Sequence, residues 1–316
     1  MKVVAIMGGL GSQMFKYAFY LMIKNKVEVE CYIDTSYYLQ KNSWNGYELQ
    51  KVFGIHAPDF KDQLSDQERK IVMQRKSNYV SVTLKRMLKN GKCNSIDYYF
   101  LGHRQRLHSY FFCIEDKVRF VFHKYYMGFG KYAKYPKDIL CSENSYFDEY
   151  PHNSDHHIER IKDQILSAFH FPEFDDNLNK SIALEMNNTN SVAIHVRRSD
   201  HLGDNGKLFE RCYYLKSVNY IKKHDSKNLK FYIFSEDLDW CKTNEDQLGL
   251  SKFDDIKYVN WNSGDNSFRD MQLMTYCKHN VLAISSFSWW GYYLSKRKNK
   301  IVCSPEGHWL EVLVHF

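Results

Sequence analysis

The sequence predicts an α/β protein with parallel, doubly wound sheets in two domains, and three observations carry this prediction. The chain has 316 residues, and because single domains seldom exceed about 250–300 residues, two domains are expected. Apolar residues make up 44% and charged residues 26% of the chain, as in ordinary globular proteins. Short apolar runs alternate with helical stretches in both halves, and this alternation is typical of parallel sheets.

The first half opens as a strand–helix–strand unit. Lys2–Met7 is expected to form a short strand, Gly8–Gly11 a turn, and Gln13–Lys24 a helix whose apolar residues share one face. Val27–Ile33 is expected to form the second strand. Over the region from about residue 45 to 140 the pattern weakens, and Asp62–Lys76 is the stretch with helical character.

The second half has a clearer pattern. A helix is expected over Ser154–Phe169 and ends before Pro172. We therefore place a domain boundary after residue 153, which gives domains 1–153 and 154–316. Short apolar runs separated by helical stretches follow, and they predict strands at Ser191–Val196, Lys230–Phe234, Lys257–Asn260, Val281–Ile284 and Lys300–Cys303.

The charge balance and the cysteines limit the class of protein. Lys and Arg number 44 against 37 Asp and Glu, which favours an anionic ligand without making the chain a polycation. No apolar run reaches 18 residues, and the opening MKVVAIMGGLG enters a glycine turn without a signal-peptide cleavage site. The eight cysteines form no CxxC pair. We therefore expect reduced thiols in a cytoplasmic protein that makes at most peripheral contact with the inner face of the membrane.

Val192–Asp200 contains the first candidate site. Side chains alternate along a strand, so His195 and Arg197 share one face, and Arg197 stands at the carboxyl end, where open α/β sheets bind ligands. An arginine can hold phosphate oxygens in a bidentate fork at any physiological pH. Arg198 points the other way and is expected to pair with an acid. In an isolated motif, a structural Arg198–Asp200 salt bridge is the more common explanation.

The segment Val281–Trp290 contains the second candidate site. A strand that ends at Ser285 and Ser286 and passes into a helix presents hydroxyls together with unpaired backbone N–H groups, and such groups bind anions. Phe287 can pack on a base or a sugar. The alternative is a simple helix cap by a serine, which is common.

Several other residues have both a functional and a structural explanation. Asp270 begins the preceding helix, where a carboxylate can accept from the N–H groups of guanine or merely cap the helix. Trp289 and Trp290 are more often core residues than ligand contacts. Asp237 and Asp239 form a DxD triplet that can hold a metal on a diphosphate, yet acids are favoured in a first helical turn by the helix dipole.

The glycine turn Met7–Gln13 is the third candidate. Its glycines let the backbone approach a ligand closely before a helix begins. The spacing matches neither the dinucleotide fingerprint GxGxxG nor a P-loop, so tight packing of strand against helix explains it equally well. A further cluster, His152, His156 and His157, lacks metal-ligand spacing and is expected at the surface.

Four blocks of the sequence, in this order, resemble glycosyltransferase family 11, the bacterial α-1,2-fucosyltransferases and their animal relatives. The blocks are GGLGSQMFKYA at Gly8–Ala18, HVRRSD at His195–Asp200, FSEDLDW at Phe234–Trp240 and CKHNVLAISSFSWWG at Cys277–Gly291. The resemblance implies a GT-B-type fold, with two Rossmann-like domains facing across a cleft. The amino-terminal domain would lie on the acceptor side and the carboxyl-terminal domain would bind GDP-fucose.

The resemblance also implies a reaction. It implies inverting transfer of L-fucose from GDP-fucose to the 2-hydroxyl of a galactose in a glycan acceptor of the surface-polysaccharide type, with no metal and no cofactor. Arg197 would hold the donor diphosphate with His195 beside it. The remaining donor-binding residues would be Asp270, Ser285, Ser286, Phe287, Gly9, Gly11, Ser12 and Gln13.

The chain departs from the family pattern in the glycine turn and after the arginine pair. Ser12 replaces a usual asparagine, Lys16 replaces a glutamine, and Ser199 stands where glycine is common. The missing asparagine removes an expected contact to the donor sugar and leaves room for a shifted donor or acceptor preference.

The mechanism needs a cation for the departing GDP and a base for the acceptor. Arg197 is the expected cation, because negative charge grows on GDP in an oxocarbenium-like transition state. Asp200 is the expected base, with Asp204 and Glu236 as rivals.

Two other classes of protein stay open from the residues alone. One is a transferase that uses another nucleotide sugar. The other is a non-catalytic nucleotide- or glycan-binding protein, or a nucleic-acid binder using the aromatic and basic stretch Tyr98–Tyr135. The sequence has no nucleic-acid motif, and its anion-binding features lie at strand ends, so we expect a transferase with no nucleic-acid partner.

Overall fold

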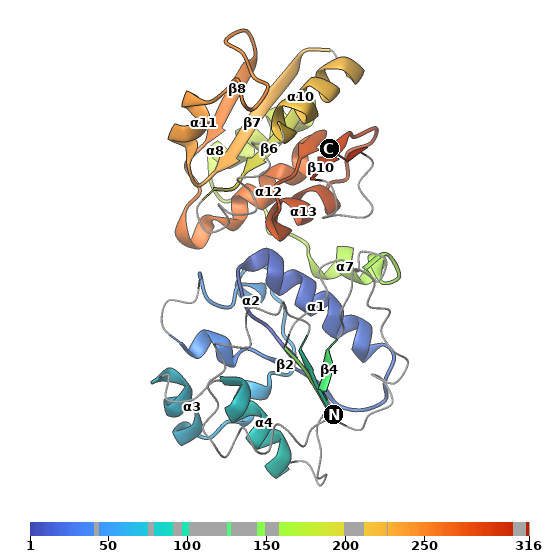
Figure 1. The fold of residues 1–316 in the computed structure, drawn as a ribbon, viewed down its shortest axis with the longest axis vertical. Coiled ribbons are helices and arrows are strands. Elements are labelled where there is room, and N and C mark those ends of the chain that lie inside the picture. Colours follow the sequence, from blue (N-terminus) through green and yellow to red (C-terminus); the bar gives the residue numbers. More distant parts are fainter. Residues whose placement is uncertain are drawn as a thin grey trace. The chain divides into compact units, whose positions relative to one another are not determined.

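The structure is a computed structural model that describes residues 1–40, 44–74, 79–90, 97–100, 125–127, 144–148, 158–198, 212–225, 227–305 and 314–315. It divides into two compact units, Met1–Phe169 and His170–Phe316 (Figure 1). Each unit contains a parallel sheet with helices, so the predicted α/β class is confirmed. No helix in the described ranges combines the length and hydropathy that a bilayer-spanning helix needs.

The first unit contains a parallel sheet with the strand order β2-β1-β5-β3-β4. Its strands are β1 (Lys2–Ala5), β2 (Cys31–Asp34), β3 (Asp97–Phe100), β4 (Tyr125–Met127) and β5 (Ser145–Phe147). Its helices are α1 (Leu10–Lys24), α2 (Leu49–Phe53), α3 (Asp66–Met73), α4 (Tyr79–Asn90) and α7 (Lys162–Ala168), with 3-10 turns at Ser36–Leu39 and Phe60–Gln63.

Helices cover both faces of this sheet because its strands are apolar on both sides. Val3 and Ala5 pack in one cluster with residues of α3 and α4. On the other face α1 crosses the sheet, and the ring of Phe19 lies 5.2 Å from that of Phe147 in an edge-on contact (Figure 1). The predicted opening strand, turn and helix are confirmed within a few residues.

Helix α7 belongs to the first unit. The ring of Phe169, just after α7, lies 6.0 Å from that of Tyr17 and 5.2 Å from that of Phe53. These aromatic contacts fix the end of α7 to α1 and α2. The unit therefore continues to Phe169, beyond the boundary after residue 153 that we expected from the sequence.

The second unit contains a parallel sheet with the strand order β11-β10-β9-β6-β7-β8. Its strands are β6 (Asn190–Val196), β7 (Leu229–Ser235), β8 (Asp255–Val259), β9 (His279–Val281), β10 (Val302–Ser304) and β11 (Val314–His315). Its helices are α8 (Asn177–Asn188), α10 (Tyr213–His224), α11 (Leu238–Thr243), α12 (Phe268–Tyr276) and α13 (Ser286–Tyr293), with a 3-10 turn at Gly264–Asn266. Four of the predicted strands of this half are confirmed within a few residues as β6, β7, β8 and β10. The strand predicted at Val281–Ile284 lies earlier, as β9, and shares only Val281 with the prediction, and the two-residue β11 was not predicted.

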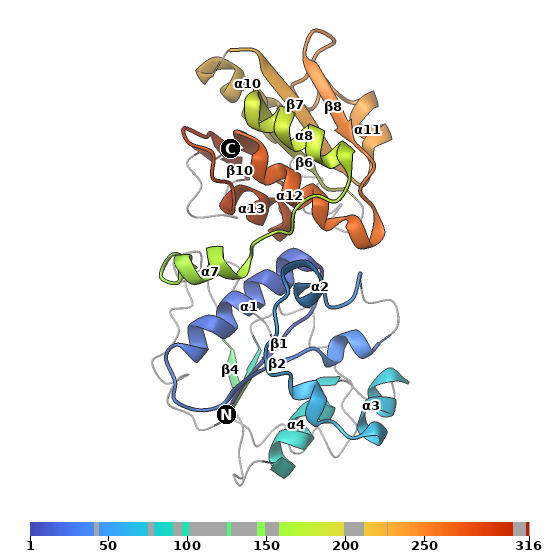
Figure 2. The ribbon, with the colours of Figure 1, turned by 180° about the vertical axis from the view of Figure 1, so that it is seen from behind.

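The expected alternation along the central strand β6 is also confirmed. Val192, Ile194 and Val196 pack in one cluster with residues of α10 and α11. Ala193 packs on the other face with residues of α8 and α12. Figure 2 shows α8 lying across this second face. The strand is thus buried on both sides, and its polar end residues are left at the carboxyl edge.

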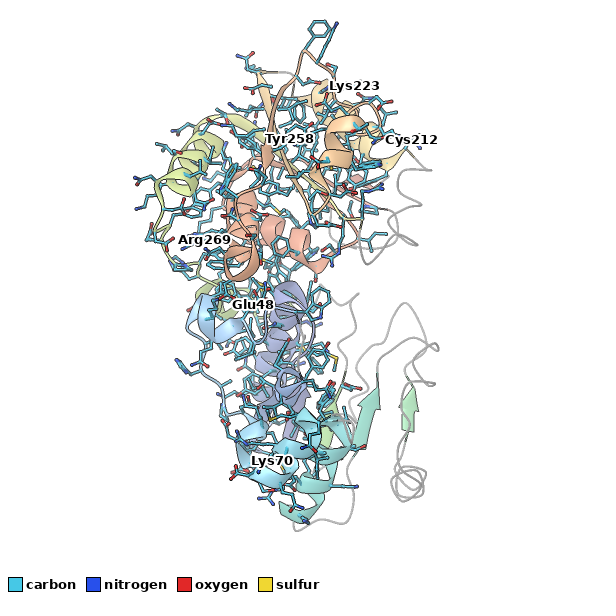
Figure 3. The ribbon with its side chains drawn as sticks, turned by 90° about the vertical axis from the view of Figure 1, so that its left-hand side faces the viewer. Glu48, Lys70, Cys212, Lys223, Tyr258 and Arg269 are labelled. Atoms are coloured by element: carbon cyan, nitrogen blue, oxygen red, sulfur yellow. The ribbon has the colours of Figure 1, made fainter. Side chains whose placement is uncertain are left out.

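In the first unit, the glycine turn after β1 is fixed by one buried amide. Gln13 is fully buried, and its Nε2 donates to the carbonyl oxygens of Gly8, at 3.0 Å, and Gly46, at 2.9 Å. Its Oε1 accepts from the backbone N–H of Glu48 at 2.8 Å. Figure 3 shows Glu48 at the start of α2, beside α1. The amide of Gln13 therefore holds the loop around residues 44–48 against the glycine turn.

We predict that Gln13→Glu destabilises the protein by about 3 kcal/mol or more, because a buried carboxylate would face two carbonyl oxygens that have lost their donors. Urea unfolding followed by tryptophan fluorescence measures this change. Gln247→Glu is the matched control, since Gln247 is exposed and the same substitution there should shift the free energy of unfolding by less than about 0.5 kcal/mol. Equal unfolding midpoints for the two variants would contradict the role assigned to Gln13.

Candidate functional site

The second sheet reverses its strand order at the centre. From β6 the chain proceeds outward to β7 and β8, and then returns to the other side of β6 with β9, β10 and β11. Open α/β sheets bind ligands outside the carboxyl ends of the strands at such a reversal. The site is therefore expected between the segments that follow β6 and β9, and these are the two segments that the sequence singled out.

His195 and Arg197 lie at the end of β6. His195 is 7% exposed, and its Nδ1 is buried without a hydrogen-bond partner among the described residues. Burial, together with the charge of Arg197, lowers the pKa of His195 well below its ordinary value, so the ring is neutral at pH 7. Arg197 follows the last residue of the strand and is half-buried. An unsatisfied buried nitrogen beside an arginine indicates a place for a ligand.

Arg198 has a structural role, as expected. Its Nε donates to Asp237 Oδ2 at 2.9 Å, and its guanidinium lies 4.0 Å from the ring centroid of Trp240. Asp237 also accepts from the backbone N–H of Trp240 at 3.2 Å and so caps α11. Asp239, 98% exposed, lies 3.3 Å from Lys242. The DxD triplet is thus the first turn of a helix, which confirms the simpler of its two explanations.

Helix α13 begins at the other side of the reversal. Ser285 is its cap, because its hydroxyl accepts from the backbone N–H of Phe287 at 3.3 Å. Ser285, Ser286 and Phe287 are half-buried. The ring of Phe287 lies 5.8 Å from that of His195. The first and second candidate sites of the sequence are therefore adjacent in the structure. The first N–H groups of a helix, with the positive end of its dipole, favour an anion here.

The core beneath this edge is buried and joined by hydrogen bonds to the strand ends. Trp289 and Trp290 are buried, which confirms their assignment to the core. Tyr213 Oη, at the start of α10, lies 2.7 Å from the carbonyl oxygen of Leu282 and 2.9 Å from that of Cys303. The neighbouring Tyr214 donates to the carbonyl oxygen of His195 at 3.0 Å. Two consecutive tyrosines thus hold the ends of β6, β9 and β10, and nothing in the local sequence around them indicated this role.

Asp270 lies in the first turn of α12. Its Oδ1 accepts from Asn262 Nδ2 at 2.8 Å. Burial raises the pKa of Asp270 to about 7, although the hydrogen bond from Asn262 opposes this shift. Helix α12 is fixed to α13 by close contact, since a Cβ at Gly291 would lie 2.8 Å from that of Met274. Helices between parallel strands run opposite to them, so the amino ends of α12 and α13 share the edge where Arg197 lies.

The residues predicted to bind the donor in the glycine turn of the first unit differ in their exposure. Gly9 is the cap of α1, and Ser12 is half-buried in the first helical turn. Gly11 is buried. Gln13 was predicted to contact the donor, but its side chain is buried and its amide bonds to backbone groups. The structure corrects this prediction: Gln13 shapes the turn and presents no surface to a ligand.

Some predictions lie outside the described residues. These include the base Asp200 and its rival Asp204, the histidines His152, His156 and His157, and most of Tyr98–Tyr135. The third candidate base, Glu236, accepts from the backbone N–H of Arg198. Within the described part of the chain, no three His, Cys, Asp or Glu side chains gather as a metal site would require.

Sequence comparisons connect this architecture to known proteins. The model of glycosyl transferase family 11 matches residues 120–307. The chain is 37% identical over 123 residues to an alpha-1,2-colitosyltransferase of Escherichia coli, an alignment that covers 37% of this chain and 40% of the relative. It is 24% identical over 311 residues to the O-antigen biosynthesis glycosyltransferase WbnK of Escherichia coli, covering 94% of this chain and 91% of WbnK. It is 26% identical over 110 residues to the galactoside alpha-(1,2)-fucosyltransferase 1 of Homo sapiens, covering 33% of this chain and 28% of that enzyme.

A comparison of folds gives the same architecture. The crystal structure of fucosyltransferase NodZ from Bradyrhizobium matches with a TM-score of 0.50 and 12% identity, covering 92% of this chain and 91% of NodZ. This likeness concerns the fold, and it supports the expected GT-B-type pair of Rossmann-like domains. The family model covers more than half of the chain, and the segments after β6 and β9 both lie within it. The chain belongs to glycosyl transferase family 11.

Proposed function

We propose that this protein transfers L-fucose from GDP-fucose to the 2-hydroxyl of a galactose in a glycan acceptor, with inversion at the anomeric carbon. The observation that carries the proposal is the meeting of Arg197, the buried His195 and the amino end of α13 at one strand reversal. This edge suits a diphosphate, because a cation, a helix dipole and a ring nitrogen that has no partner in the described part of the chain converge there. The relatives named alpha-1,2-fucosyltransferases support the choice of sugar and linkage.

Arg197 would stabilise the leaving group. Departure of GDP places growing negative charge on its phosphate oxygens, and an arginine fork meets that charge without metal. Metal independence is part of the proposal. Asp237 of the DxD triplet binds Arg198 and caps α11, and the exposed Asp239 pairs with Lys242. Asp200 remains our proposed base for the acceptor hydroxyl, and its replacement by Asn should lower turnover more than donor binding.

Asp270 would bind the guanine. An ionised carboxylate accepts hydrogen bonds from the ring and exocyclic N–H groups of guanine, whereas a protonated one loses part of this capacity. Its place at the start of α12, on the same edge as Arg197, fits a nucleotide that extends from the diphosphate along the sheet edge. Phe287 would contact the sugar or base from α13.

Two observations, a sequence identity and the residue at position 12, support a donor other than GDP-fucose. The alignment with the colitosyltransferase has 37% identity, against 24% and 26% for WbnK and the human fucosyltransferase, although it covers a shorter segment than that with WbnK. Colitose is fucose without its 3-hydroxyl. Ser12 in place of the family asparagine lies in the turn proposed to face the donor sugar, and a shorter side chain there suits a donor lacking a hydroxyl. The name of WbnK supports an acceptor of the O-antigen type for either donor.

The reaction itself is tested by GDP release. We expect the protein to release GDP from GDP-fucose, to release it faster with lactose as acceptor, and to keep this activity in EDTA. Release from the GDP derivative of colitose but not from GDP-fucose would establish the second donor instead. Loss of activity in EDTA, with recovery on adding a divalent metal, would refute metal independence.

Replacing Arg197 should remove most turnover. We predict a loss of about 10²–10³-fold in kcat for Arg197→Ala, because one preorganised donor to the leaving group is lost. Arg197→Lys should also be poor, since an ammonium cannot reproduce the fork. The matched control is Arg198→Ala, which removes the Asp237 pair and the Trp240 contact and should lower stability by about 1 kcal/mol with kcat nearly unchanged. Similar kcat values for the two alanine variants would refute the role of Arg197.

Donor binding should depend on pH through Asp270. Binding that needs the carboxylate is weakened below the pKa of about 7, so the Kd for GDP should rise as pH falls, approaching tenfold per pH unit. Calorimetric titrations with GDP between pH 5.5 and 8 measure this slope. Asp270→Asn should bind GDP weakly, and its Kd should depend less on pH. Asp239→Asn, on the exposed turn of α11, should keep the pH dependence of the wild-type Kd. A wild-type Kd that is constant over this range would contradict the assignment.

A further inference from the structure

We propose that the exposed face of Trp44, in the first unit, is the stacking surface for the galactose ring of the acceptor. The inference rests on the proposed function, because it assigns the acceptor of that same reaction to a residue outside the diphosphate site. Its evidence is the exposure, backbone conformation and position of this one tryptophan.

Trp44 is held in an unusual and exposed conformation. Its side chain is 56% exposed, and its backbone has φ of +52°, in the left-handed region that bulky residues seldom adopt. The following residues are held by Gln13, which bonds to the Gly46 carbonyl and the Glu48 N–H. The buried amide of Gln13 thus fixes the loop at residues 44–48, while the side chain of Trp44 in this loop is exposed to solvent. Such an arrangement indicates a ligand contact when it lies at a binding edge.

The position of Trp44 is at such an edge. A Cβ built on Gly9 would lie 3.4 Å from Trp44 Cε3, so the six-membered ring of the indole rests against the cap of α1. Gly9 follows β1, which lies between β2 and β5 in its sheet. The chain proceeds from β1 to β2 on one side, and β5 pairs on the other. This is the strand reversal of the first sheet, and Trp44 covers its carboxyl edge.

The chemistry of this edge suits a neutral sugar. Lys16, the basic residue in the first half of α1, is buried and donates to the carbonyl oxygen of Asp148 at 2.9 Å, so its charge is directed into the fold. Among the residues that the structure describes at this edge, the exposed indole of Trp44 lies beside the backbone of Gly9. The C–H bonds at C3, C4 and C5 of a galactopyranose form an apolar face that packs on an aromatic ring. The hydroxyls on the rim of the sugar stay available for transfer and hydrogen bonding.

Steady-state kinetics with lactose and calorimetry with GDP test the inference. Trp44→Ala should raise the KM for lactose about tenfold or more, while the Kd for GDP stays at the wild-type value, because the ring would contact the galactose and not the nucleotide. Trp44→Phe should recover part of the loss, since a smaller ring keeps some stacking. Phe253→Ala is the matched control, because Phe253 is 87% exposed on the second unit and its loss should leave the KM for lactose unchanged.

The outcomes separate this inference from the proposed function. An unchanged KM for lactose in an active Trp44→Ala enzyme would overturn the stacking role and leave the proposed reaction intact. If the wild-type protein fails to release GDP, the proposed reaction fails, and a fluorescence titration with lactose decides the role of Trp44. A saturable change in wild type that is absent in Trp44→Phe would support the stacking surface. No change with lactose in wild type would overturn it.

Discussion

The parallel pairing of β6 with β9 is the interaction on which the candidate site depends. Its register sets Ile194 beside Val281, and β6 then continues to Val196 while β9 ends. The chain leaving β9 must therefore run beside the end of β6, which brings the start of α13 toward His195. Buried tyrosines of α10 bond to the strand ends on both sides of this pair. Without that pairing, an arginine and a helix end that are far apart in sequence would have no common ligand.

The two edges of the second sheet use their polar groups differently. At the amino edge, burial opposes ionisation of Asp225, yet hydrogen bonds from Lys278 and His279 lower its pKa to about 2. His279 is satisfied on both ring nitrogens, since its Nδ1 accepts from the N–H of Ile301. At the carboxyl edge, His195 has a ring nitrogen without a partner among the described residues, and burial raises the pKa of Asp270. Polar groups that satisfy one another stabilise a fold, whereas unsatisfied ones fit a ligand.

The carboxyl edges of the two sheets carry different chemical groups, and we assign a different part of the proposed reaction to each. The second unit offers a cation, a helix dipole and a carboxylate, which suit a nucleoside diphosphate. The first offers a glycine turn and an indole face, which suit a neutral sugar. Gln13 explains why the first edge has its shape, because its buried amide spans the turn and the loop that ends in α2. Its role in shaping the site is indirect, through the position of Trp44.

The sequence by itself determined most strands of the second unit, the two faces of β6 and the pairing of Arg198 with an acid, because these follow from local periodicity and strand direction. The ligand-binding role of Arg197 remains part of the proposal. It also determined the family, since the four motifs stand in order along one chain. Only the tertiary structure decided the role of Gln13, whose partner Glu48 is remote in sequence, and the extent of the first unit, which depends on Phe169 packing on Tyr17 and Phe53. It likewise decided that Trp44 rests on Gly9. Periodicity reports which face of an element is buried, but hydrogen-bond partners and ring contacts depend on which distant segments the fold brings together.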